Sequence, residues 1–283
     1  MTVTFQSCEI ALHNPADAAD LDTEVPGHRA PGAVPGTLSL GELAARLELP
    51  LPDDPTLVAT AFSTRCLGRD DVLYRAGDPF ESLFIAWSGV FKTVLIDAAG
   101  LEQVLAFPGP GDVLGIDGID SGRHPSEAVA LDRSHVVVVP FARIDQLAHQ
   151  DRAIGRLLHR MLGRELERKH TMMWLLGTLH ADARVAAFLL DVASRRAELG
   201  LPGDAIDLRM TRGELGSYLG VKLETVSRAL SAFAAAGLIR VERRSVTLLD
   251  PDGLRQILER EGAASRAAPW LRMIHPVATA PAT

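Results

Sequence analysis

Short apolar segments separated by turn residues occupy the chain from about residue 62 to residue 141. Gly-Asp, Ser-Gly, Ala-Gly and Pro-Gly pairs stand between these segments, and each segment is only three to seven residues long. Short strands at a spacing of about ten residues are typical of an antiparallel barrel or roll. We therefore predict a β-roll with strands at residues 72–74, 83–87, 90–96, 103–107, 127–131 and 135–139.

Beyond residue 141 the apolar residues recur every three or four positions, which is the period of an α-helix. A helix over residues 153–176 would extend for about 40 Å. Its apolar stripe consists of Leu158, Leu162, Leu166, Met173 and Leu176. A long apolar stripe needs a partner surface, and two partners stay open: the preceding roll, or the same helix of a second copy. We favour the dimer, in which Lys169 and His170 interrupt the seam.

A further helix over residues 182–199 precedes the most informative segment, residues 210–233. Thr211 and Glu214 have the spacing of a capping box, so a helix is expected to begin there. Gly220 supplies a tight turn, and a second helix follows it. The buried stripe of that second helix is Val226, Leu230 and Phe233, and the opposite face carries Glu224, Ser227 and Arg228. This arrangement predicts a helix-turn-helix.

The polar triple suits the reading of DNA bases in the major groove. Arg228 can bond to two acceptors of a guanine, Glu224 can accept from a cytosine amino group, and Ser227 can do either. The alternative is a Glu224–Arg228 ion pair on a solvated face, which contributes only about 0.3–0.5 kcal/mol. The preceding helix and the glycine turn favour DNA reading.

Residues 237–249 have the pattern of a hairpin that turns at residues 242–244, which would be the wing of a winged helix. The turn presents two arginines, and arginines beside a reading helix typically contact phosphates. We expect the DNA backbone to be contacted by Thr211, Arg212, Lys222, Arg243 and Arg244.

The net charge of −7 would argue against a nucleic-acid partner, but its distribution does not. Residues 1–55 contain nine acidic and two basic residues, which accounts for all of the net charge. Residues 207–247 carry seven basic and four acidic residues. The negative net charge therefore comes from the acidic first 55 residues. The rest of the chain is neutral overall and has a basic segment near its C-terminal end.

The patterns together predict an α+β fold in five parts. They are a flexible acidic, Pro-rich extension at 1–55, the β-roll at 56–142, a dimerisation helix at 143–177, the winged helix-turn-helix at 178–256 and a tail at 257–283. Within the extension, residues 38–49 are a candidate for a short helix. The chain has only two cysteines, no apolar run long enough for a membrane helix and no secretory pattern at its N-terminus. We expect a cytoplasmic protein that does not enter a membrane.

This order of elements resembles the Crp/Fnr family of bacterial transcription regulators over about residues 62–256. The motifs nearest to its Fnr branch are GDVLGID at 111–117, SGRHPS at 121–126, VPF at 139–141, ARVAAF at 183–188, TRGE at 211–214 and ETVSR at 224–228. The resemblance implies a cyclic-nucleotide-binding-like roll and a homodimer that reads TTGA half-sites in an inverted repeat of double-stranded DNA. Glu224, Ser227 and Arg228 match the family's E-x-x-S-R signature.

The resemblance also implies contact with RNA polymerase through a turn of the roll. That turn corresponds here to Asp97, Gly100 and Glu102. Leu101 stands where an acidic residue is common in the family, so the chain departs from the family pattern at this turn.

The sensing chemistry is the second departure from the family. Oxygen-sensing Fnr proteins hold a [4Fe–4S] cluster with four cysteines, whereas this chain has Cys8 and Cys66 alone. Members that bind cyclic AMP hold its phosphate with an Arg-Ser/Thr pair, but His124 and Pro125 stand there, and proline offers neither hydroxyl nor N–H. We expect neither group and no cofactor, as in FixK-like members, which are controlled by their abundance.

Haem and a redox response at Cys66 or Cys8 stay open as alternative signals. The histidines that could ligate haem are His124, His135, His149, His159 and His170, none of them in a Cys-x-x-Cys-His motif. A cupin-like metalloenzyme would need a His-x-His cluster, which the chain lacks. A protein-interaction module that does not bind DNA would not need the polar triple opposite a core stripe. The sequence therefore predicts a regulator and not an enzyme.

Overall fold

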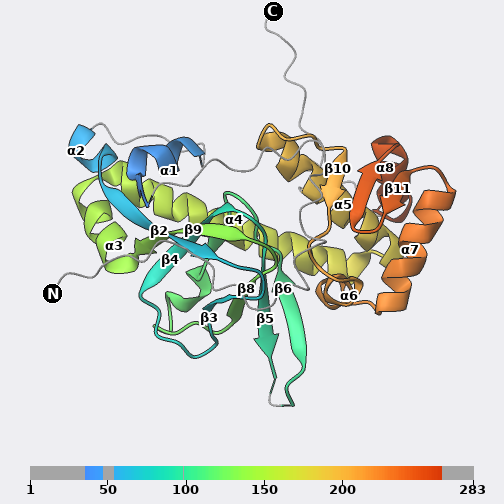
Figure 1. Cartoon of the computed structure of the whole chain (residues 1–283), viewed down its shortest axis with the longest axis horizontal. Coiled ribbons are helices and arrows are strands. Elements are labelled where there is room, and N and C mark those ends of the chain that lie inside the picture. The colour runs from blue at the N-terminus through green and yellow to red at the C-terminus, as the bar shows by residue number, and fades with distance from the viewer. Residues whose placement is uncertain (1–35, 47–53, 98, 263–283) are drawn as a thin grey trace, which may run out of the picture.

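The computed structural model describes residues 36–46, 54–97 and 99–262 (Figure 1). A β-rich half lies at one end of the molecule, and a half made mostly of helices lies at the other. One long helix runs from the first half into the second. The predicted C-terminal tail lies outside the described residues from position 263 onward, as do residues 1–35 of the predicted extension.

The β-rich half is a roll of two antiparallel sheets, as the short apolar segments predicted. The larger sheet has the order β1-β2-β9-β4-β7, formed by β1 (Thr37–Ser39), β2 (Ala61–Leu67), β9 (Ser134–Pro140), β4 (Ser82–Ser88) and β7 (Val113–Leu114). The smaller sheet has the order β3-β8-β5-β6, formed by β3 (Val72–Tyr74), β8 (Glu127–Ala130), β5 (Phe91–Ile96) and β6 (Glu102–Ala106). A short 3-10 helix, η2 (Ile116–Gly118), follows β7.

Strand β9 shows why an uninterrupted valine run forms the centre of the larger sheet. It pairs with β2 on one side and with β4 on the other. Val136 and Val137, on opposite faces of the strand, are both fully buried. A strand that is covered on both faces favours β-branched residues at consecutive positions.

The extension predicted over residues 1–55 is too long. Residues 37–46 form β1 and the helix α1 (Leu40–Arg46), and β1 pairs with β2 through Leu38 opposite Phe62. Leu38, Leu40 and Leu43 are buried in the core of the roll. A short helix was expected within residues 38–49, but its attachment to the roll was not, because these leucines are buried against β2, α4 and the larger sheet, which lie far along the chain.

Helices α2 (Pro55–Val58) and α3 (Phe141–Gln150) flank the roll, and the long helix is α4 (Arg152–Thr178). Asp151 separates α3 from α4, because its backbone is extended and its carboxylate accepts a hydrogen bond from the Ala153 amide at 2.6 Å. Among the described helices, none is both long and apolar enough to cross a membrane.

The C-terminal half is the predicted winged helix. It consists of α5 (Ala181–Glu198), β10 (Ala205–Asp207), α6 (Arg212–Leu219), α7 (Leu223–Ala235), β11 (Ile239–Glu242), β12 (Ser245–Leu248) and α8 (Pro251–Gly262). Its three-stranded sheet has the order β10-β12-β11, and the β11–β12 hairpin is the wing. The core beneath α6 and α7 contains Leu215, Val226 and Val246, each of them fully buried.

Candidate nucleic-acid interface

Helix α6 begins with the capping box that the sequence predicted. The Thr211 hydroxyl accepts a hydrogen bond from the Glu214 amide at 3.1 Å, and the Glu214 carboxylate accepts one from the Thr211 amide at 2.7 Å. The two side chains satisfy amide groups that a helix N-terminus would otherwise leave unpaired. They fix the point at which the first helix of the helix-turn-helix starts.

Two glycines make the turn between α6 and α7. Gly220 ends α6 with a φ of 64°, in the left-handed region that favours glycine. Gly216 lies inside α6, where a Cβ atom would approach the Val221 carbonyl oxygen to 2.7 Å. Any larger residue at 216 would push the turn away from α6. The sequence pattern indicated Gly220 but not Gly216, since a glycine inside a helix shows its reason only in the packed structure.

Arg184 is a second residue that sequence reasoning missed. Its guanidinium group donates to the backbone carbonyls of Leu176, Leu179 and Leu219, at 2.8, 2.9 and 3.0 Å. The first two carbonyls lie at the end of α4, and the third lies at the end of α6. Arg184 therefore ties the long helix to the turn of the helix-turn-helix, a link that no local sequence pattern signals.

Helix α7 has the two faces that the sequence predicted. Val226, Leu230 and Phe233 are buried, with Val226 completely inaccessible. Glu224 and Arg228 are exposed and Ser227 is half-buried. Within the described residues the two charged groups form no ion pair with each other; instead Arg228 donates to the Thr225 hydroxyl at 3.5 Å. The polar face of α7 is therefore open to an outside partner.

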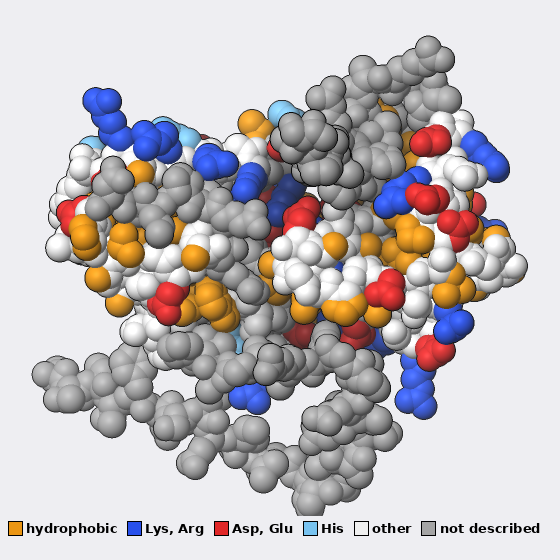
Figure 2. Space-filling model, turned by 90° about the horizontal axis from the view of Figure 1, so that it is seen from above, with side chains coloured by type: hydrophobic (Ala, Val, Ile, Leu, Met, Phe, Trp, Pro, Cys, Tyr) orange, Lys and Arg blue, Asp and Glu red, His pale blue; other side chains and the backbone are white. Residues whose placement is uncertain are grey.

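The residues predicted to contact a DNA backbone differ in their availability. Lys222, at the start of α7, is exposed, and Arg243 and Arg244 are exposed in the turn between β11 and β12. Arg212 is half-buried, and burial lowers the pKa of its guanidinium group. Thr211 already bonds within the capping box. Lys and Arg side chains also project at both ends of the molecule in the space-filling view (Figure 2).

The apolar stripe predicted on α4 divides between two environments. Leu162, Leu166 and Met173 are 39%, 56% and 62% exposed. Leu158 instead packs against the core of the roll, and Leu176 lies next to the turn, where a Cβ on Gly220 would approach it to 3.4 Å. Part of the stripe is thus covered within one chain, and its middle is an uncovered apolar surface.

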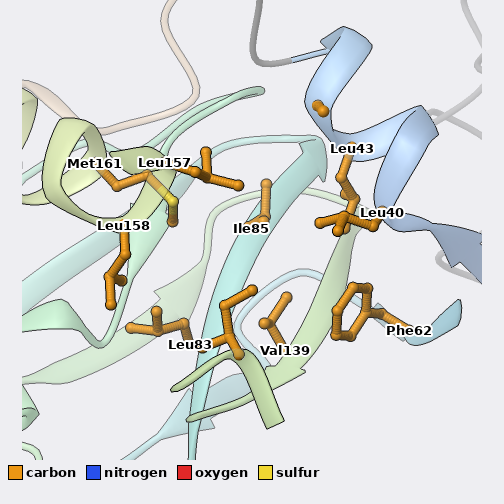
Figure 3. A pocket seen from close by; sticks show the side chains of 11 residues that line it. Leu40, Leu43, Phe62, Leu83, Ile85, Val139, Leu157, Leu158 and Met161 are labelled. Carbon is orange, nitrogen blue, oxygen red and sulfur yellow. The ribbon is translucent and has the colours of Figure 1, made fainter. Parts of the chain in front are cut away.

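A small apolar pocket lies between α1, α4 and the larger sheet of the roll (Figure 3). Leu40 and Leu43 of α1 face Leu157, Leu158 and Met161 of α4 across it. The remaining lining is also hydrophobic and comes from Ala44, Phe62, Leu83, Ile85, Val139 and Ile144. A pocket without a polar group offers nothing to orient a charged ligand.

The residues named for haem or redox sensing are dispersed. His149, His159 and His170 are exposed on α3 and α4, while His135 is half-buried and bonded to the Ser88 hydroxyl at 3.0 Å. Cys66 is half-buried on β2, and Cys8 lies outside the described residues. Among the described residues, no three His, Cys, Asp or Glu side chains gather in a group that could hold a metal ion.

Comparison with known proteins agrees with this architecture. The family descriptions that match are a cyclic nucleotide-binding domain over residues 64–151 and a Crp-like helix-turn-helix domain over residues 183–257. The transcriptional regulatory protein Btr of Bordetella pertussis is 39% identical over 193 residues, which are 68% of this chain and 80% of that protein. The chain belongs to the Crp/Fnr family of transcription regulators.

Further relatives support the same assignment. The transcriptional activator protein Anr of Pseudomonas aeruginosa is 38% identical over 212 residues, which are 75% of this chain and 87% of that protein. The structure of FixK2 from Bradyrhizobium japonicum is 30% identical and superposes with a TM-score of 0.63, over 69% of this chain and 96% of that one. The family consists of regulators and not of enzymes.

In the roll of this Crp/Fnr protein, residues 123–126 bond to other groups of the roll. Arg123 donates to the Gly77 carbonyl at 2.7 Å, and the Ser126 hydroxyl donates to the Asp117 carboxylate at 2.9 Å, a negative group that would repel a phosphate. His124 is 3% exposed and stacks on Tyr74 with 3.9 Å between ring centroids. A Cβ on Gly115 would approach the His124 ring to 2.9 Å. Residues 123–126 are thus hydrogen-bonded within the roll, and His124 is closely packed there.

We expect His124 to make the stability of the roll depend on pH. Burial lowers the pKa of His124, and Asp117 and Asp78 offset only part of this effect. Because the unfolded chain takes up the proton more readily, stability that is present above about pH 6.5 is lost as the pH falls through the folded-state pKa. His124→Phe keeps an aromatic ring and should flatten the decline in unfolding free energy between pH 7.5 and 5.5, measured by urea denaturation.

The exposed His149 provides the control for this prediction. His149→Gln also removes a histidine, but from an exposed position on α3 outside the packed roll, and it should leave the decline with pH unchanged. Some slope should remain in His124→Phe, because burial also lowers the pKa of His135. One proton contributes at most about 1.4 kcal/mol per pH unit. An unaltered slope in His124→Phe would show that His124 is protonated in the folded roll without cost.

Proposed function

We propose that a homodimer of this chain binds TTGA-type inverted repeats in the cytoplasm through α7 and regulates transcription through RNA polymerase. The observation that carries the proposal is the exposed polar face of α7, with Glu224, Ser227 and Arg228 opposite a fully packed core stripe. Binding of the full chain to a TTGA-N6-TCAA duplex, compared with a scrambled duplex of the same composition, tests it.

The three side chains divide the reading of a half-site by their chemistry. Arg228 donates two hydrogen bonds to O6 and N7 of the guanine, and Glu224 accepts from the amino group of a cytosine on the complementary strand. Ser227 adapts to either a donor or an acceptor. Each good pair contributes about 1–3 kcal/mol of discrimination against the wrong base.

Basic residues around α7 supply affinity that does not depend on sequence. Lys222, Arg243 and Arg244 contact phosphates, which fixes the register of α7 in the groove. Thr211 and Arg212 flank the same surface, but the partial burial of Arg212 makes its contribution smaller.

We predict that Arg243→Ala weakens binding to specific and scrambled duplexes by the same factor. The reason is that Arg243 lies in the exposed turn of the wing and contacts phosphates but no bases. The slope of log affinity against log salt concentration should fall by about 0.9 for each phosphate that the variant no longer neutralises. A titration series over salt concentration measures both effects, and a change in the specific-to-scrambled ratio would contradict the assignment.

The dimer in this proposal is held along α4. Along this seam Leu162, Leu166, Lys169 and Met173 follow one another at spacings of four, three and four, which is the repeat of a two-stranded coiled coil. Lys169 is the polar member of this seam and pairs with Glu165 at 3.1 Å. A charged residue at a seam position costs stability and fixes the register of the two helices.

Contact with RNA polymerase is assigned to the β5–β6 turn, at Asp97, Gly100 and Glu102. The Asp97 carboxylate already accepts from the amides of Ala99 and Leu101, at 2.8 and 2.9 Å, and Glu102 pairs with Lys92 at 3.3 Å. Leu101, 71% exposed at the tip, is the side chain most open to a partner. The contact is therefore apolar at its centre.

A further inference from the structure

The outer edge of the roll meets the first helix of the helix-turn-helix. Strand β6 is the last strand of the smaller sheet, so one side of its backbone has no strand partner. Ser217 of α6 lies against this side, and its hydroxyl accepts from the Val104 amide at 2.9 Å. The side-chain amide of Gln103 donates a hydrogen bond to the backbone carbonyl of Ser217. A helix thus takes the place of a further strand at an edge that would otherwise be exposed.

An ion pair joins the same two elements. Lys92 of β5 lies 2.9 Å from the Glu214 carboxylate and 3.3 Å from that of Glu102, and the Lys92 and Glu214 side chains are only 15% and 21% exposed. Burial opposes the charge on Lys92, but its bonds to Glu214 and Glu102 raise its pKa overall. The second oxygen of Glu214 serves the capping box with Thr211. The roll is therefore bonded to a member of the capping box at which α6 begins.

An aromatic cluster and a buried acid reinforce the contact. Phe107 of the roll, Phe188 of α5 and Tyr218 of α6 meet edge to face, with 5.2–6.2 Å between ring centroids. Asp112 of the roll is 6% exposed and binds Arg168 of α4 and Arg195 of α5. Val94, Val104 and Phe107 belong to the same hydrophobic cluster as the core of the C-terminal half. Roll and winged helix thus share one core.

The contact leaves the DNA-reading surface open. The bonds described above join the roll to α4, α5 and α6, and none of them reaches α7. Glu224 and Arg228 stay exposed, and α7 lies at the far end of the molecule from α3 (Figure 1). A contact that blocked DNA would cover α7 or the wing. This one fixes the orientation of α6, and with it that of α7, relative to the dimer helix.

We propose that Lys92, Gln103 and Val104 form a hairpin clamp that holds α6 in the DNA-binding orientation without a bound effector. The proposal rests on the proposed function and gives the roll a part in DNA binding that requires no bound ligand. A winged helix that rotates freely is in the DNA-binding orientation for only a fraction of the time. Its apparent affinity for DNA is then reduced to that fraction of its full value. Lys92 and Ser217 are therefore positioning residues: they orient α6 and do not contact DNA themselves.

The test uses the full-length chain with Lys92→Met and Ser217→Ala, singly and together. We expect the double variant to bind the specific duplex about tenfold more weakly, within the usual range of coupling between parts of a protein. Amide exchange at residues 178–181, between α4 and α5, should become faster at the same time. Arg143→Met is the matched control, because Arg143 is exposed on α3 and its side-chain hydrogen bond within the described part of the chain is to Gln146 of the same helix. It should change neither measurement.

A second pair of variants separates the clamp from a general loss of stability. Glu214→Gln keeps an oxygen for the capping box but loses the charge that pairs with Lys92. In that background Lys92→Met should have little further effect on either measurement. Tighter DNA binding by Lys92→Met would show that the contact inhibits, and unchanged binding and exchange would show that it is irrelevant; both results overturn the proposal. If the wild-type chain binds the TTGA and scrambled duplexes equally well, the proposed function fails. The clamp is then tested by amide exchange alone, which should still be faster at residues 178–181 in the double variant.

Discussion

Arg228→Ala is expected to reduce the ratio of affinities for the TTGA-N6-TCAA and scrambled duplexes by at least about 30-fold. Each Arg–guanine pair contributes about 1–3 kcal/mol of discrimination, and a homodimer on an inverted repeat loses two of them. The fold should be unaffected, since Arg228 is exposed and bonds only to Thr225. Fluorescence anisotropy with both duplexes at one fixed salt concentration measures the ratio.

Arg243→Ala is the matched control for this result, because it removes the same side chain from another exposed position of the winged helix. It should lower both affinities and leave their ratio intact. If Arg228→Ala behaved like Arg243→Ala, Arg228 would be another phosphate contact, and base reading would have to be assigned to other residues.

Leu162→Glu is expected to give a monomer that no longer binds the inverted repeat. Leu162 is 39% exposed and is the first residue of the uncovered part of the α4 stripe. In a dimer the introduced carboxylates would face each other across a seam that excludes water, where unpaired charges are strongly unfavourable. Sedimentation velocity measures the mass, and a single TTGA half-site should then be bound as weakly as by one independent winged helix.

Arg156→Glu introduces the same side chain on another exposed face of α4. This variant should stay dimeric and still bind the inverted repeat. Its added negative charge should change the affinity for every duplex by the same factor. A dimeric Leu162→Glu protein would place the interface elsewhere, and the exposed Leu166 and Met173 would then need another explanation.

Local signals made the DNA-binding half predictable from the sequence. Three features could be recognised from neighbouring residues alone, because each extends over only one or two turns of helix: the capping box of Thr211 and Glu214, the glycine at 220 and the apolar stripe of α7. The roles of Arg184 and Asp112 could not be recognised in this way. Each binds groups far along the chain, at the end of α6 for Arg184 and on α4 and α5 for Asp112, and only the folded chain brings them together.

The roll was predictable only where its strands carry apolar runs. Strand β9, with its valines, was identified, but β2 was not, because in β2 only Phe62 and Leu67 are buried, and polar residues lie between them. Without β2 there was no partner for β1, and residues 37–46 were assigned to the extension. The α4 stripe was recognised as one surface, although Leu158 and Leu176 contact their own chain and leave Leu162, Leu166 and Met173 for a partner.

The most direct measurement is the affinity of the wild-type chain for three duplexes of equal length and composition. The first carries two intact TTGA half-sites, the second carries one, and the third carries none. If a dimer reads both half-sites through α7, affinity should fall in two steps, each of about 1–3 kcal/mol for every base pair that is changed. Equal affinity for all three duplexes would contradict sequence-specific reading of TTGA repeats by this protein.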